Sequence, residues 1–288
     1  MKWLLLGAAA LALAACSAAR LGYSHGHELA FWWLDGYAGF NGEQSPQVRA
    51  ALREWFAWHR STQLPDYADL LAQAQRDVLA PTTPEAVCRW FDAFGERIDV
   101  ALAQARPRLA EVALALTPEQ IARIEQRIAK SNDEFRDEFL QDEPARRQRE
   151  AVKHTVERFE NVYGRLDRAQ RERVAQWVAA SPFDPERWFA ERQLRQRDLL
   201  ATLRDLQALP AAERTPARAE QAVAGLVERF TNSPRAEYAA YQQRLRAYNC
   251  DIVARLHNDT TPAQRQAAQS KLRGWEQDAR ALAGNGAP

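Results

Sequence analysis

Residues 116–128 read Leu-Thr-Pro-Glu-Gln-Ile-Ala-Arg-Ile-Glu-Gln-Arg-Ile, and this stretch decides the fold class of the chain. Thr117 stands directly before a proline, which is typical of a helix start because Thr caps the first free N–H groups and proline suits the first helical position. Ile121, Ile124 and Ile128 then recur at steps of three and four residues and form one apolar stripe. The stretch therefore predicts a helix that begins just after Thr117 and buries one side.

The same start signal recurs along the whole chain, while the period-two alternation typical of strands is almost absent. We therefore expect an all-α protein with about ten helices in an elongated multi-helix bundle. The capping residues that precede a proline are Thr83, Thr117, Asp184, Thr215, Ser233 and Thr261. The predicted helices span 28–39, 46–60, 65–79, 84–105, 118–140, 145–163, 167–180, 185–208, 216–231, 234–257 and 262–282.

The predicted helices 118–140 and 145–163 are long and are separated by a short turn, so we expect them to pair as an antiparallel helical hairpin. Residues 28–283 are expected to form a single all-helical domain, which can divide into two subdomains near 181–185. The Gly- and Ala-containing tail 284–288 is expected to be disordered.

A short motif with a capping residue and a glutamine three positions later occurs at several helix starts. It is predicted to form a capping box, in which the first side chain accepts from a backbone N–H and the glutamine reaches back to the cap. The motif thus has a structural explanation without any chemistry. Its members are Thr117 with Gln120, Asp167 with Gln170, Thr261 with Gln264 and, in looser form, Asn41 with Gln44.

The N-terminus has the features of an export signal. Lys2 is followed by an apolar run from Trp3 to Ala15 that is too short to span a bilayer. The run ends in Leu-Ala-Ala before Cys16 and resembles the bacterial lipobox. We expect residues 1–15 to be a signal peptide, Cys16 to be the site of lipid attachment and 16–27 to be a linker. The alternative is an ordinary signal peptide with an incidental cysteine.

Two further cysteines, Cys88 and Cys250, remain in the mature chain. An exported protein meets an oxidising compartment, so an even pair favours a disulfide between them. The alternative is two separately buried thiols, since a free cysteine packs as a small apolar side chain.

Composition excludes some functions. Removing residues 1–15 takes away one lysine and no acid, which leaves basic and acidic residues in equal number and argues against a nucleic-acid partner. His25, His27 and Glu28 could ligate a metal, but an exposed linker is the favoured interpretation. Asp35 and Glu54 are a weak candidate pair for acid–base chemistry. We therefore assign no catalytic residue, metal or cofactor.

Aromatic residues are dense close to Cys16. Phe31, Trp32, Trp33 and Tyr37 occur there together with Phe40. Tryptophan and tyrosine favour the membrane–water interface, so this segment could rest on a bilayer. Packing of these rings into the core of the domain is the favoured alternative.

Two resemblances add to this picture. The L-T-x-x-Q pattern at 116–120 is similar to that of the Spy and CpxP family of periplasmic chaperones, which cradle unfolded or stress-related clients. More of the chain resembles an uncharacterised family of proteobacterial lipoproteins, a domain of unknown function that implies no activity. The matching stretches are 20–23, 32–35, 58–60, 64–68, the helix around Cys88, 116–120 and 248–250.

These observations predict a lipid-anchored periplasmic protein without enzymatic activity that binds envelope proteins or unfolded clients, as a chaperone-like, stress-related or assembly-scaffold protein. Ser17 after the cysteine favours sorting to the outer membrane by resemblance to other lipoproteins. The alternative function is an envelope hydrolase that acts on peptidoglycan or lipid through Asp and Glu side chains.

Overall fold

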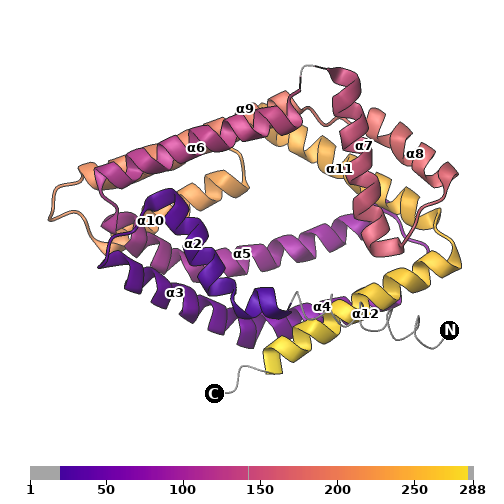
Figure 1. The fold of residues 1–288 in the computed structure, drawn as a ribbon, viewed down its shortest axis with the longest axis horizontal. Coiled ribbons are helices and arrows are strands. Elements are labelled where there is room, and N and C mark those ends of the chain that lie inside the picture. The colour runs from indigo at the N-terminus through magenta and orange to yellow at the C-terminus, as the bar shows by residue number, and fades with distance from the viewer. Residues whose placement is uncertain (1–19, 142, 285–288) are drawn as a thin grey trace, which may run out of the picture.

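The structure, a computed structural model, describes residues 20–141 and 143–284, and within these ranges it contains helices and no strand. The all-α prediction is therefore confirmed. The elements are α2 (Gly26–Ala38), α3 (Gln44–Trp58), the π-helical turn η1 (His59–Gln63), α4 (Leu64–Asp77), α5 (Pro84–Ala115), α6 (Pro118–Phe139), α7 (Pro144–Tyr163), α8 (Arg168–Ala179), α9 (Pro185–Ala208), α10 (Pro216–Thr231), α11 (Ala236–Asn258) and α12 (Pro262–Gly284). Figure 1 shows their arrangement.

Most of the predicted helix starts follow the capping chemistry of the sequence, but the one predicted at Ser233 is wrong, because α11 begins at Ala236 without a side-chain cap. The side chains of Thr83, Thr117, Asp184 and Thr215 each accept a hydrogen bond from the backbone N–H three residues later. One predicted end is wrong, because α5 continues to Ala115 where the sequence predicts an end at residue 105. The helix passes through Pro107, and packing of its last turns into the core offsets the hydrogen bond that this proline cannot donate.

The predicted hairpin of the sixth and seventh helices is not formed. α6 packs on α9 and α2, whereas α7 packs on α8 and α12. Figure 1 shows α6 lying along α9 while α7 turns away from it. The reason lies in the α6 stripe, because Phe135 stacks on Trp188 and Phe189 of α9 at ring distances of 4.9 and 5.3 Å. A short turn allows α6 and α7 to pair, but α9 offers α6 the larger apolar contact, so α6 packs there instead.

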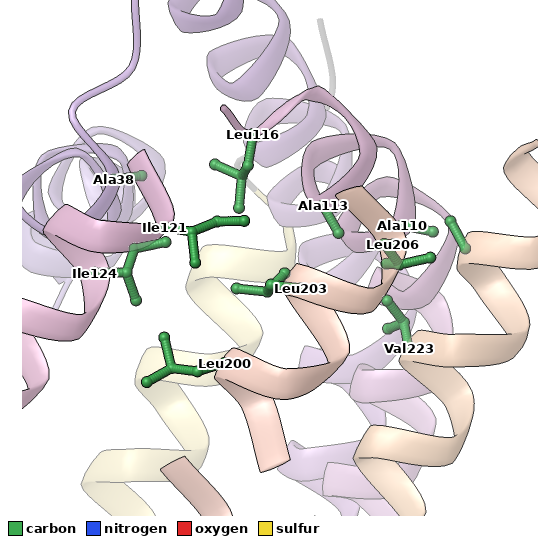
Figure 2. Packing of buried hydrophobic residues seen from close by; sticks show 11 residues of the cluster. Ala38, Ala110, Ala113, Leu116, Ile121, Ile124, Leu200, Leu203, Leu206 and Val223 are labelled. Atoms are coloured by element: carbon green, nitrogen blue, oxygen red, sulfur yellow. The ribbon is translucent and has the colours of Figure 1, made fainter. Parts of the chain in front are cut away.

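Buried apolar residues gather in two large clusters at different places in the fold, and a third, smaller cluster joins α5 to α11. The first cluster joins the last turns of α5 to α2, α6, α9 and α10 around Leu116, Ile121 and Leu203 (Figure 2). The second joins α7, α8, α11 and α12 around Leu166, Val174 and Leu256. Helices α9 and α10 follow residues 181–185 but belong to the first cluster, together with α2, α5 and α6. A boundary near 181–185 therefore does not separate the two large clusters.

Residues 20–27, the described part of the linker predicted for 16–27, are folded against the protein. Residues 20–24 are helical, and Arg20 forms an ion pair with Asp278 of α12 at 2.6 Å. The hydroxyl of Tyr23 lies 2.8 Å from Nδ1 of His59, which is buried. Residues 1–19 and 285–288 lie outside the described part of the chain, and the predictions for a signal peptide, for lipid on Cys16 and for a disordered tail fall on these residues.

Candidate binding surfaces

Each of the four capping motifs forms both of its hydrogen bonds. In α6, Thr117 Oγ1 accepts from the N–H of Gln120 at 3.3 Å, and Gln120 Oε1 accepts from the N–H of Thr117 at 2.9 Å. The same two bonds join Asp167 to Gln170, Thr261 to Gln264 and Asn41 to Gln44. The looser motif at residue 41 therefore behaves like the other three.

The motifs are also joined in pairs, which the sequence did not indicate. The amides of Gln44 and Gln120 donate to each other, with N···O distances of 3.1 and 2.7 Å. Gln170 and Gln264 do the same, with 2.9 Å in both directions. Each pair therefore ties together two helix starts that lie far apart in the sequence.

The second donor of each amide follows one rule. It bonds the carbonyl two residues before the capping residue of the partner motif, so Gln44 reaches Ala115 and Gln120 reaches Gly39. In the other pair, Gln170 reaches the carbonyl of Asp259 and Gln264 that of Arg165. Within each pair, the two glutamines thus make the same set of hydrogen bonds to each other's motif, and the two pairs have the same arrangement.

The motif glutamines have no hydrogen-bonding capacity to spare. In each, both N–H donors are used, and the oxygen accepts from the capping residue and from the partner amide. The Gln170 side chain is fully enclosed, with 1% of its surface exposed. The amides therefore hold the fold together, and a ligand would have to break this network to contact them.

Two cysteines far apart in the sequence are joined. Cys88 and Cys250 form a disulfide with a Cα–Cα distance of 5.4 Å. The bond links the first turn of α5 to α11 beside a small cluster of Val87 and Ala254. The N-terminal end of α5 is thus fixed covalently, as its C-terminal end is fixed by the first core cluster.

The candidate metal and acid–base residues serve as structural contacts. Glu28 pairs with Arg49 of α3, and the Arg49 guanidinium lies 3.6 Å from the centre of the Phe31 ring. Within residues 20–141 and 143–284, no group of three His, Cys, Asp or Glu side chains could hold a metal ion. Asp35 accepts from the N–H of Phe40 at the end of α2, while Glu54 pairs with Arg108 of α5. The structure thus gives Asp35 and Glu54 separate partners.

Every carboxyl group with a resolved pKa shift among the described residues has a lowered pKa, caused by ion pairs or by hydrogen bonds at helix starts. Burial acts to raise the pKa of Glu191, but hydrogen bonds from Arg235, Ser233 and Arg195 outweigh it, so the pKa lies below the ordinary value. A backbone hydrogen bond from Leu166 lowers the pKa of Glu160. Both groups are therefore held in the charged form, whereas a general acid at neutral pH needs a raised pKa.

The two best-defined hollows on the surface are open. One, of about 400 Å³, lies between α9 and α10 and is lined by residues such as Asp205, Arg218 and Arg229. The other, of about 650 Å³, lies at the start of α8 beside Arg165, Arg168 and Glu172. Neither brings together a nucleophile, a base and an orienting group, as a catalytic site would.

An uncovered apolar stripe runs along α5. Between Val87 and Ala110, about six turns of helix, no residue of α5 is buried. Phe91, Phe94 and Ile98 lie on one side of the helix at steps of three and four residues, and Leu109 lies on the same side farther along. Phe94 is 51% and Ile98 59% exposed. Val87 lies on the same side of α5 and is buried. The exposed stripe therefore continues a side of the helix that is buried nearer its N-terminal end.

The aromatic residues of α2 divide between core and surface. Phe31 is buried, and Phe40 packs against the first core cluster, as the favoured interpretation expects. Trp32 and Trp33 are 66% and 64% exposed. Within the described residues, no helix is both long enough and apolar enough to cross a bilayer. The exposed side of α2 and the α5 stripe are therefore the two candidate binding surfaces.

This architecture defines an all-α protein in which capped helix starts are joined two by two. The chain belongs to the family of unknown function DUF6279, which matches residues 36–212. No curated protein and no solved structure is significantly similar to the chain. The matched region begins within α2 and ends after α9, so it contains the Gln44–Gln120 pair and Gln170, while Gln264 lies beyond it.

Proposed function

We propose that this protein is a lipid-anchored, non-enzymatic protein of the periplasmic side of the outer membrane, and that it binds other proteins along the α5 stripe. The single observation that supports binding is the exposure of Phe91, Phe94 and Ile98 on a helix that is fixed at both ends. An exposed apolar patch of this kind costs solubility unless a partner covers it.

The stripe suits a partner of defined chemistry. From Phe91 to Leu109 it extends over ~27 Å at about 1.5 Å per residue. An amphipathic helix, or an unfolded segment with apolar side chains at helical spacing, could lay its apolar side along that length. We therefore propose unfolded or partly folded envelope proteins as clients, as the resemblance to Spy and CpxP also suggests.

The export and anchoring parts of the proposal are supported by the sequence before residue 20. Lys2, the apolar run and Leu-Ala-Ala before Cys16 fit a lipoprotein signal. The disulfide between Cys88 and Cys250 fits an oxidising compartment, since such bonds are rare where glutathione keeps thiols reduced. The rival hydrolase function has less support, because Asp35 and Glu54 are occupied by different structural partners.

Site-specific crosslinking in cells tests the binding surface. A photoreactive amino acid is placed at Phe94, and the matched control position is Glu96, which is also exposed but lies on the opposite side of α5. We expect crosslinked envelope proteins from position 94 and few from position 96. Equal yields from both positions, or none from position 94, would contradict the proposal.

A further inference from the structure

The outer side of residues 20–38 carries no charge. Eight residues in this segment are exposed, and none of them is Lys, Arg, Asp or Glu, although 27% of the whole chain is charged. The large side chains among them are Leu21, Leu29, Trp32 and Trp33, and the others are Gly, Ser and His25. Leu29, Trp32, Trp33 and Gly36 share one side of α2.

The opposite side of the segment is held against the protein, so the uncharged side is fixed outward. Phe31 is buried beneath the Arg49 guanidinium, whose partner Glu28 also belongs to α2. Tyr23 is tied to His59, and Arg20 to Asp278. Arg20 and Glu28 are thus paired with charges elsewhere in the protein, Asp35 accepts from the N–H of Phe40, and the large side chains left exposed are apolar.

The position of this surface along the chain identifies what covers it. Arg20 is four positions after Cys16, so their Cα atoms lie within ~14 Å of each other whatever path the chain takes. Acyl chains on Cys16 would therefore hold a bilayer close to Leu21 and the start of α2. Tryptophan side chains favour the headgroup region of a bilayer, where an apolar ring and a polar N–H are both satisfied.

We propose that the uncharged side of α2 rests in the interfacial layer of a phospholipid bilayer, with Trp32 and Trp33 among the headgroups. This rests on the proposed anchoring through Cys16, which brings the bilayer within reach. Acyl chains on Cys16 would hold the protein on the bilayer but leave its orientation free, and a second contact restrains it. The α2 surface supplies that contact and fixes how the domain is oriented on the membrane.

The test measures contact between tryptophan and lipid directly. Lipidated protein is reconstituted into vesicles of phosphatidylethanolamine and phosphatidylglycerol whose acyl chains are brominated near the headgroup, and its acylation is checked by mass spectrometry. We expect the bromolipid to quench part of the tryptophan fluorescence. The double variant Trp32→Phe/Trp33→Phe should lose most of that quenching, while Trp275→Phe, which removes an exposed ring of α12, should keep it.

The outcomes separate this surface from the anchor. If the acylated protein shows no quenching, or if Trp32→Phe/Trp33→Phe leaves the quenching unchanged, the membrane contact is wrong while the anchor stands. Sedimentation as a dimer with unquenched Trp32 and Trp33 would likewise overturn it in favour of a second copy. If no acyl chain is found, the proposed anchoring is wrong. Flotation of the same, non-acylated chain with vesicles then tests the α2 surface by itself. Flotation that Trp32→Ser/Trp33→Ser abolishes would support the surface, and no flotation would overturn it.

Discussion

Gln170 and Gln264 donate to each other across the starts of α8 and α12, with 2.9 Å for each N···O distance, although 94 residues separate them. Each glutamine also completes the capping box of its own helix. One glutamine amide thus caps its own helix and also forms a contact with a distant helix start. Gln44 and Gln120 repeat the arrangement in the other core cluster. A motif that explains single helix starts therefore also determines which helices meet.

The glutamine pair should be coupled in stability. Gln170→Ala leaves buried partners without hydrogen bonds, at ~1–3 kcal/mol for each lost group. We expect each single variant to lower the free energy of unfolding by about 1–4 kcal/mol, and the double variant with Gln264→Ala to cost less than the sum. Urea unfolding of the four proteins measures this. Gln176→Ala, which removes an exposed side chain of α8, should change little, and additive losses would contradict the pairing.

The disulfide between Cys88 and Cys250 should stabilise the folded protein. Cys88→Ala/Cys250→Ala frees a loop with a sequence separation of 162 residues, and we expect the free energy of unfolding to fall by ~2–5 kcal/mol. A reductant should have a similar effect on the wild type and none on the variant. Non-reducing peptide mapping of protein from the periplasm should recover the Cys88–Cys250 pair. Stoichiometric thiol labelling of both cysteines in native material would show that the bond is absent.

His257 should make stability depend on pH. Burial lowers its pKa from 6.5, its Nε2 donates to the carbonyl of Ala80 at 2.7 Å, and its Nδ1 accepts from the Tyr163 hydroxyl at 2.9 Å. Because the folded pKa is depressed, the unfolded chain takes up a proton first, so stability is lost as pH falls below about 6.5 until the folded pKa is passed.

The variant His257→Gln separates this effect from other titrations. It should be less stable than the wild type at pH 7.5 and should lose less stability between pH 7 and pH 5. The control His154→Gln removes an imidazole that is only partly buried on α7 and should keep the pH dependence of the wild type. Chemical unfolding at both pH values measures the difference. A wild-type pH dependence in His257→Gln would rule out this role.

The lipid anchor is tested at Cys16. The Cys16→Ala chain should incorporate no radioactive palmitate and should remain an uncleaved precursor or become soluble, because the thiol that accepts the diacylglycerol is gone. The wild type should be labelled and recovered with membranes. Labelling of the variant at the wild-type level would show that the acyl chains are attached elsewhere or not through the proposed signal.

The capping hydrogen bonds at the helix starts were predictable from the sequence, but which helices pack against each other was not. Thr117 and Gln120 stand three residues apart, so their capping box follows from the order of residues. The partner of Gln120 is Gln44, and three different pairings of the four glutamines were open to the chain. The α6–α7 hairpin was expected from a short turn, but the stacking of Phe135 on α9 decided otherwise.

Exposure was the other property that the sequence could not supply. Phe91, Phe94 and Ile98 have the spacing of core residues, and spacing alone does not tell whether another helix covers them. Trp32 and Phe31 are neighbours of similar character, yet one is exposed and the other is buried, because α3 packs on only one side of α2. Both candidate surfaces depend on such missing tertiary partners.

The exposed stripe of α5 is proposed to bind apolar polypeptide. The most direct measurement is light scattering of guanidinium-denatured carbonic anhydrase diluted into buffer, with and without the protein. We expect the wild type to suppress aggregation and Phe94→Ser/Ile98→Ser to need at least about tenfold more protein for the same effect, since loss of ~1.4 kcal/mol of binding is tenfold. Leu79→Ser/Phe183→Ser, which removes exposed apolar residues elsewhere, should act like the wild type. Equal suppression by both double variants, with unchanged melting curves, would contradict the claim.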